Sequence, residues 1–245
     1  FYKHFCDVAF ESIKVLTISK RQINKRFKIV NLELIKKYYR ENKHILLYAA
    51  HHGNWEWLSF SKLQTSLKVI TLYQPQSNKY FDELFVTIRE RCGVKCVPSD
   101  KGFRTIMGLV NGNEPSLSAL IGDQSPPKES ARHWVKFLNQ DTTFLMGVDR
   151  IHKRTKQIVL FPSFKKVKRG YYELEFKIID TQKHLESDYP LIDSYAKILE
   201  ETINESPEMW LWSHRRWKLS KPQHIHIKQK STERIPEQKR EYILD

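Results

Sequence analysis

Residues 44–57 read His-Ile-Leu-Leu-Tyr-Ala-Ala-His-His-Gly-Asn-Trp-Glu-Trp, and this stretch decides the fold. Its apolar run of about six residues is typical of a buried strand, and the run stops abruptly at two histidines and a glycine. Asn54 belongs to the residue types that cap helices, so we expect a helix to begin near Trp55. A buried strand that leads directly into a helix is a building unit of α/β sheets, which bind ligands at the carboxyl ends of their strands.

A histidine at such a strand end, with a glutamate five residues later, is well placed to act as a general base beside a carboxylate. We expect Glu56 to accept a hydrogen bond from one ring nitrogen of His51 and to leave the other nitrogen basic. An ordinary loop histidine is the alternative. No metal is expected, because the helical His-Glu-x-x-His pattern is absent and because His52 points away from His51 if the strand period persists.

The remaining chain alternates between amphipathic and continuous apolar segments. The pattern predicts helices over residues 4–18, 32–41, 55–67, 79–92, 102–110, 142–153 and 191–204, and strands over residues 45–50, 69–73, 94–97, 117–121, 158–161 and 171–179. This order predicts an α/β fold, a single domain with a partly parallel, mixed central sheet flanked by helices. We assign residues 1–217 to this domain and expect residues 218–245, which are polar, to form a loosely ordered tail.

Composition points to an anionic partner. The 245 residues carry a formal net charge of +14, which favours nucleic acid, acidic lipid or an acidic protein. No segment approaches the roughly 20 apolar residues that cross a bilayer. The chain opens at Phe1 rather than Met, so we expect that an N-terminal piece with a membrane anchor could precede it. The three cysteines lack metal-binding spacing and are expected to be reduced thiols.

Further polar clusters follow other predicted elements. Arg89 and Arg91 lie near a helix end, Gly122-Asp123-Gln124 follows a strand, and residues 212–217 read Trp-Ser-His-Arg-Arg-Trp. Paired arginines between tryptophans suit phosphate or carboxylate groups, with cation–π packing on a surface helix as the alternative. The arginines near the helix end could equally be solvated charges.

A basic stretch also bears on the partner. Between Arg150 and Gly170 there are eight Lys or Arg residues and no Asp or Glu. A solvated hairpin explains this run, and the run also suits an anionic surface.

In this order, the clusters resemble the bacterial lipid A biosynthesis acyltransferases, the late-acting family that adds secondary acyl chains. The similarity runs from the Tyr2-x-His4-Phe5 opening to Lys218. The family's His-x4-Glu motif falls on His51 and Glu56. Its second block matches Tyr73-x-Pro75-x-x-Asn78 through Asp82 to Arg89-x-Arg91, its third Asp123-Gln124, and its closing block Trp212-x-His214-Arg215-Arg216-Trp217.

The resemblance implies a glycerolipid-acyltransferase-like fold and a reaction. His51 would deprotonate a hydroxyl of a lipid A precursor, Glu56 would orient His51, and the alkoxide would attack the thioester of an acyl-carrier-protein donor. Arg89 is the candidate for charge stabilisation of the oxyanion. The substrate-binding residues would be Asn78, Arg89, Arg91, Asp123, Gln124, His214, Arg215 and Arg216. No cofactor or metal is needed.

The same resemblance implies work at an anionic membrane surface, on the cytoplasmic face of the inner membrane. A related acyltransferase that acts on a phosphoinositol mannoside or an ornithine lipid is the nearest alternative. A basic nucleic-acid-binding protein is the alternative from another class. No nucleic acid is expected as a partner, because the sequence has no helix-turn-helix, zinc-finger or RNP-like pattern.

Overall fold

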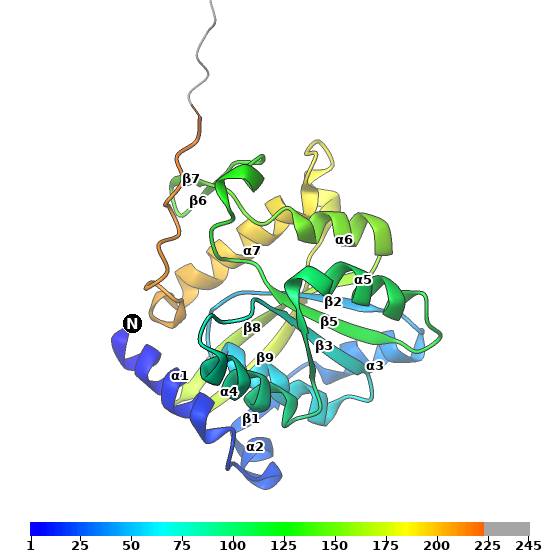
Figure 1. Ribbon diagram of the computed structural model, residues 1–245, viewed down its shortest axis with the longest axis vertical. Helices are drawn as coiled ribbons and strands as arrows, with labels where there is room; N and C mark the ends of the chain where they lie inside the picture. Colours follow the sequence, from blue (N-terminus) through cyan, green and yellow to red (C-terminus); the bar gives the residue numbers. More distant parts are fainter. Residues whose placement is uncertain (223–245) are drawn as a thin grey trace, which may run out of the picture.

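A computed structural model describes residues 1–222 of the protein, which are built around a seven-stranded sheet in the order β1-β9-β8-β2-β5-β3-β4 (Figure 1). The strands from β8 to β4 run parallel, whereas β9 is antiparallel to β8 and carries β1 beside it. Their bounds are β1 (Phe27–Ile29), β2 (Ile45–Ala49), β3 (Lys68–Tyr73), β4 (Lys95–Pro98), β5 (Ser116–Ile121), β8 (Ile158–Lys168) and β9 (Tyr171–Ile178). The predicted partly parallel, mixed α/β sheet is therefore confirmed.

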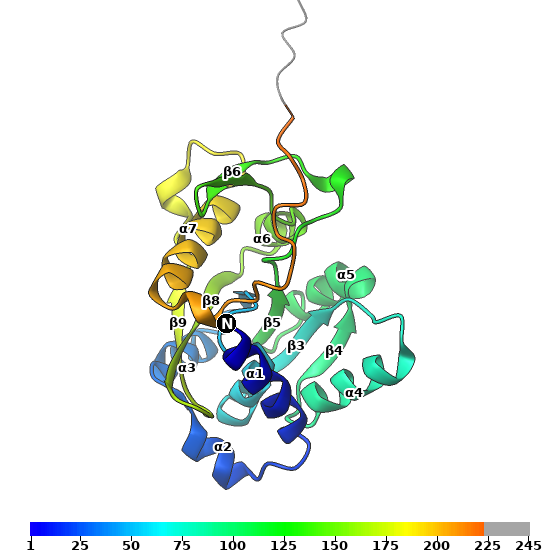
Figure 2. The same ribbon diagram turned by 90° about the vertical axis from the view of Figure 1, so that its left-hand side faces the viewer.

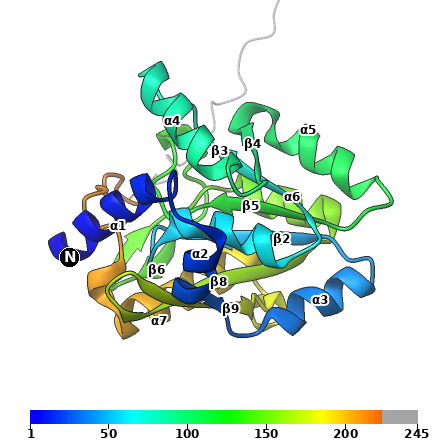
Figure 3. The same cartoon turned by 90° about the horizontal axis from the view of Figure 1, so that it is seen from below.

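Helices cover both faces of the sheet. One face packs against α2 (Lys20–Arg26), α3 (Leu32–Arg40), the 3₁₀ helix η1 (Trp55–Gln64) and α4 (Lys79–Glu90), and α1 (Tyr2–Lys14) lies on the same side against η1, as Figure 3 shows from below. The other face packs against α5 (Ser99–Val110), α6 (Gly147–Thr155) and α7 (Pro190–Glu205). Two separate apolar clusters, one on each face, form the core.

The central strand β2 explains the apolar run that decided the fold. Ile45 and Leu47 belong to one core cluster, whereas Leu46 and Tyr48 belong to the other. A strand that is buried on both faces needs apolar side chains at every position, and all five residues of β2 are buried. The strand ends at the carboxyl edge of the sheet, and the polar residues that follow it begin at His51.

Several predicted elements have different bounds in the structure. The segment after His51 is a 3₁₀ helix rather than an α-helix, and β8 continues to Lys168 instead of ending at residue 161. The helix expected from residue 142 begins only at Gly147, because β6 (Val135–Phe137) and β7 (Gln140–Thr142) first form a small antiparallel ribbon. Helix α2 and strand β1 were not predicted. Short 3₁₀ turns are η2 (Lys128–Ser130), η3 (Thr181–His184) and η4 (Pro207–Met209).

Most of the expected C-terminal tail, residues 223–245, lies outside the described residues. Within residues 1–222, none of the helices has the length and apolar character that a bilayer crossing requires.

Candidate active site

The register between β2 and β5 brings two strand ends together. Ala49 lies opposite Ile121, so that His51 and Asp123, each two residues further along, meet at the carboxyl edge of the sheet. The His51 Nδ1 atom lies 2.6 Å from Asp123 Oδ1, and the His51 backbone N–H donates to Asp123 Oδ2 at 2.9 Å. One carboxylate therefore holds both the imidazole ring and the backbone of His51.

Gly122 permits this close approach. Its backbone N–H donates to the carbonyl of Ala49 at 3.1 Å, which continues the strand pairing up to the site. A Cβ atom at this position would lie 2.0 Å from the ring of Tyr48, which is itself stacked on Tyr195 with 3.6 Å between ring centroids. No side chain fits there, so glycine is required for Asp123 to reach His51.

Asp123 is almost fully buried, with 3% of its surface exposed. Trp210 adds a third hydrogen bond by donating from Nε1 to Asp123 Oδ2 at 2.8 Å. Burial alone would raise the pKa of the Asp123 carboxyl, but His51 and these hydrogen bonds hold the pKa below its ordinary value. Burial likewise lowers the pKa of His51, and the Asp123 carboxylate outweighs it, so that the net shift is upward. The pair is thus a carboxylate beside an imidazole of increased basicity.

Glu56 does not occupy the place that the sequence predicted for it. Its carboxylate is bound by Arg89 in a two-pronged ion pair, with Arg89 Nε at 2.9 Å and Nη2 at 2.7 Å. Burial lowers the pKa of Arg89, but Glu56 outweighs that effect and the pKa is raised. The prediction that Glu56 accepts from a ring nitrogen of His51 is corrected, because Asp123 takes the hydrogen bond at Nδ1. Two ion pairs therefore lie side by side at the site.

The turn that carries His51 is fixed from several directions. Gly53 has a φ of +69°, and a Cβ atom there would lie 2.3 Å from Phe164. Asn54 caps η1 by accepting from the Trp57 backbone N–H at 3.3 Å, as predicted. The carbonyl of His51 accepts from the backbone N–H of Leu211, so the C-terminal block pairs directly with this turn.

A cavity of about 210 Å³ opens beside His51 and extends along the sheet beneath η1. Its polar lining includes His51, Glu56 and Arg89, and the part of its wall that strands β2, β3 and β5 provide is mostly apolar. That wall includes Leu47, Ala49, Val69, Leu117 and Ala119. Such a cavity suits a narrow apolar chain whose reactive end lies at the polar mouth.

Three of the predicted substrate-binding residues occupy quite different positions. Gln124 is exposed and lines the cavity near His51. Asn78 is exposed and caps α4, where its side chain accepts from the backbone N–H groups of the first turn. Arg91 donates to the carbonyls of Val15 at 2.6 Å and Ile18 at 3.1 Å. Two donors of Arg91 are thus engaged in holding the segment after α1.

The closing block is split between surface and interior. Arg215 is exposed, whereas Arg216 is only 2% exposed and donates to the Thr143 carbonyl at 2.5 Å, with Phe144 beneath its guanidinium. Burial lowers the pKa of Arg216 to about 10. For Arg216, the aromatic ring that lies against the guanidinium is therefore Phe144 rather than one of the neighbouring tryptophans.

The neighbouring histidines are also separately engaged. His214 Nε2 accepts from the Ser125 backbone N–H at 3.0 Å. His52 is buried and bonds the Ser206 carbonyl through Nε2 at 3.1 Å, so it faces away from the His51 pair. Across residues 1–222, no three His, Cys, Asp or Glu side chains gather in a way that could hold a metal ion.

Together, these features define a class of α/β proteins with a histidine–carboxylate pair at the carboxyl edge of the sheet and an apolar cavity beside it. The chain belongs to the bacterial lipid A biosynthesis acyltransferase family, whose model matches residues 1–219. It is similar to a lipid A biosynthesis acyltransferase of Haemophilus influenzae, with 25% identity over 198 residues that cover 79% of this chain and 60% of the relative. The chain thus spans about three fifths of that relative's length. The predicted family resemblance is confirmed.

Proposed function

We propose that this protein transfers a fatty acyl chain from a thioester to a hydroxyl of a lipid A precursor, with His51 as the general base. The observation that carries the proposal is the His51–Asp123 pair at the mouth of an apolar cavity. Asp123 engages Nδ1, and within residues 1–222 no hydrogen bond is made to Nε2, so Nε2 is the nitrogen that takes the hydroxyl proton.

The reaction then needs no covalent enzyme intermediate. The acceptor oxygen loses its proton to His51 and attacks the thioester carbonyl, and the thiol leaves with the proton that His51 held. General-base catalysis contributes roughly 10²–10⁴-fold, so stabilisation of the oxyanion must supply a comparable effect. Arg89 lines the cavity beside His51 and supplies a positive charge there. Its ion pair with Glu56 fixes the direction of the guanidinium, which gives Glu56 a supporting role.

The donor that we propose is an acyl-carrier-protein thioester, and its acyl chain would enter the apolar cavity. A carrier protein that is acidic would be attracted to a chain whose net charge is +14. The acceptor would be a lipid A precursor at the cytoplasmic face of the inner membrane. Gln124 and Arg215 are exposed polar residues that remain candidates for contact with the acceptor.

The test is incubation of the protein with acyl carrier protein loaded with chains of different length and a tetra-acylated lipid A precursor, followed by mass spectrometry. A mass increase of one acyl group on the lipid is expected. His51→Ala should reduce kcat/KM by more than about tenfold, a loss above ~1.4 kcal/mol of transition-state stabilisation, in a variant whose circular dichroism spectrum shows that it remains folded.

Parallel reactions decide the substrates. Acyl-coenzyme A as donor, and a phosphoinositol mannoside or an ornithine lipid as acceptor, are offered under identical conditions. Transfer to one of these acceptors and none to the lipid A precursor would overturn the acceptor assignment. Full activity of His51→Ala on every acceptor would overturn the general-base assignment.

A further inference from the structure

Helix α1 is amphipathic, but it exposes its apolar side instead of burying it. The residues that it exposes are mostly apolar: Tyr2, Phe5, Cys6, Ala9, Phe10 and Ile13. The exposed fractions are 80% for Tyr2, 73% for Phe10 and 57% for Ile13. We call these six residues the α1 strip. Figure 2 shows α1 (dark blue) on the face turned toward the viewer, with its outer side uncovered.

The face of α1 that packs against the protein is mostly polar, with Val8 as its buried apolar residue. Asp7 is buried and accepts from Lys166 Nζ at 3.0 Å and from Arg169 Nε at 2.7 Å, both on the β8–β9 hairpin. The Glu11 carboxylate accepts from Asn54 Nδ2 at 2.6 Å and from the Tyr172 hydroxyl at 3.0 Å. These ion pairs and hydrogen bonds fix the orientation of the helix.

The same polar face ties α1 to the turn that carries the catalytic histidine. His4 Nε2 lies 3.1 Å from the Gly53 carbonyl oxygen, and Asn54 of that turn donates to Glu11. A surface on which the α1 strip rests would therefore be held in a fixed relation to His51.

Soluble helices normally bury their apolar stripe, and a contiguous exposed stripe marks a contact surface. The charged residues that α1 exposes are both lysines, Lys3 and Lys14. The neighbouring hairpin tip adds the exposed Lys165, Lys168 and Arg169. An apolar stripe with a basic rim matches an anionic lipid surface, where apolar groups enter the headgroup boundary and lysines meet the phosphates.

We propose that the α1 strip docks on an anionic lipid bilayer, with α1 lying in the plane of the interface and the catalytic turn held beside it. This inference rests on the proposed function in one respect: a lipid acceptor explains why the protein would bind a membrane. A second copy of this chain is a poorer occupant, because pairing two strips would bring two sets of basic residues together. At 13 residues, α1 by itself is too short to cross a bilayer.

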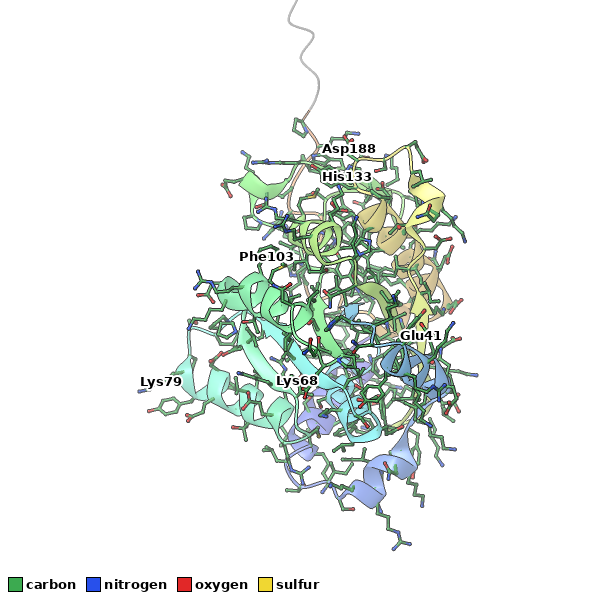
Figure 4. The ribbon with its side chains drawn as sticks, turned by 90° about the vertical axis from the view of Figure 1, so that its right-hand side faces the viewer. Glu41, Lys68, Lys79, Phe103, His133 and Asp188 are labelled. Carbon is green, nitrogen blue, oxygen red and sulfur yellow. The ribbon has the colours of Figure 1, made fainter. Side chains whose placement is uncertain are left out.

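The direct test is flotation with vesicles of phosphatidylethanolamine and phosphatidylglycerol, and with vesicles of phosphatidylcholine alone. The test variant is Tyr2→Ser/Phe10→Ser/Ile13→Ser, none of which lies at the proposed active site. The matched control is Phe103→Ser/Leu185→Ser, which removes exposed apolar side chains elsewhere. Phe103 lies on α5. It is labelled in Figure 4, which shows the side of the molecule opposite to that in Figure 2, where α1 faces the viewer.

Binding of the unchanged protein and of the control to the anionic vesicles is expected, with weak binding to phosphatidylcholine. The triple variant should bind the anionic vesicles at least about tenfold more weakly. Lys3→Ser/Lys14→Ser should weaken binding about fivefold for each lysine removed. Equal binding of the triple variant and the control would overturn the proposal. So would a concentration-dependent dimer that the triple variant abolishes, if no vesicle binding accompanies it.

A second measurement leaves the apolar side chains in place. Cys6 lies in the α1 strip and is exposed, so it accepts an environment-sensitive fluorophore. A blue shift on addition of the anionic vesicles is expected for this label, and none for a label at Phe103→Cys in a Cys6→Ser background. Absence of the shift at Cys6 would contradict docking. Because neither readout needs acyl transfer, failure of docking and failure of the proposed reaction can be told apart. Acyl transfer to detergent-dispersed lipid should be unchanged in the triple variant.

Discussion

Asp123 binds His51 through both carboxylate oxygens, one on the imidazole Nδ1 and the other on the backbone N–H. This arrangement fixes the orientation of the His51 ring, because the ring cannot rotate without losing the hydrogen bond at Nδ1. It also fixes the tautomer, because the Asp123 carboxylate can only accept a hydrogen bond from Nδ1. A nearly buried carboxylate in this position keeps the proton on Nδ1 and leaves Nε2 basic. The activity of the site should therefore depend strongly on the Asp123 carboxylate.

Asp123→Asn should lower kcat by roughly 10²–10⁴-fold, because an amide can donate to Nδ1 and so favour the wrong tautomer. The Asp123 carboxylate raises the pKa of His51, so its removal should move the acidic limb of the kcat/KM profile toward lower pH. The profile is measured between pH 5 and 9 for both proteins. An unchanged limb, together with a small loss of rate, would show that Asp123 does not control His51.

Trp210 should act as a positioning residue for the same carboxylate. Trp210→Phe keeps an aromatic ring but removes the donor to Asp123 Oδ2, so kcat should fall about tenfold while KM stays nearly constant. Trp212→Phe is the matched control, since Trp212 donates to the Pro207 carbonyl instead. Equal effects of the two substitutions on kcat would contradict this role.

The Glu56–Arg89 pair should show strong thermodynamic coupling. Only 6% of the Glu56 side chain and 23% of the Arg89 side chain are exposed, so either single substitution leaves a poorly solvated charge. Glu56→Gln or Arg89→Gln alone should cost about 3 kcal/mol in the free energy of unfolding, and the double variant less than the sum. The coupling energy is obtained from a double-mutant cycle, in which urea unfolding gives the free energy of unfolding of the unchanged protein and the three variants.

The exposed Lys68–Glu114 pair provides the comparison for that cycle. Its coupling should be no larger than the error of the measurement, because solvent screens both charges. Similar coupling in the two cycles would mean that burial does not strengthen the Glu56–Arg89 pair.

The two strand ends of the site could be read from the sequence, but their meeting could not. Both apolar runs stop at polar residues, and His51 and Asp123 are each visible as strand-end groups. They are 72 residues apart, and their contact depends on β2 and β5 being neighbours in the sheet, which follows from packing of the whole domain. Glu56 is near His51 in sequence, but its carboxylate is engaged by Arg89.

Hydrophobic periodicity also left open which face of a helix is buried. The pattern over residues 4–18 predicts an amphipathic helix, and α1 is observed over Tyr2–Lys14. Its apolar side is exposed because Asp7 and Glu11 find partners on other elements, and such partners are set by tertiary structure. The burial of Arg216 could not be predicted for a similar reason, since the Thr143 carbonyl that it binds lies 73 residues away in the sequence.

Gly122 should tolerate no side chain. Gly122→Ala would place a Cβ atom 2.0 Å from the Tyr48 ring, and the stacking on Tyr195 prevents that ring from moving aside. A loss of about 3 kcal/mol in the free energy of unfolding is expected. Gly108→Ala is the control, because the space around that position in α5 is open and alanine should stabilise the helix by about 0.8 kcal/mol. A neutral Gly122→Ala would show that the strand ends can separate.

His52 should make the fold sensitive to acid. Burial lowers its pKa to about 4, whereas an unfolded histidine titrates near 6.5. Between these two values the unfolded chain binds more protons than the folded one, so stability falls as the pH decreases through this window. The full difference corresponds to about 3 kcal/mol. His51 acts in the opposite sense, since its raised pKa adds stability below about pH 6.5 that is lost as the pH rises through the folded value. Urea unfolding at pH 7, 6, 5 and 4 should therefore give a shallower decline for His52→Gln than for the unchanged protein, and parallel declines would contradict this account.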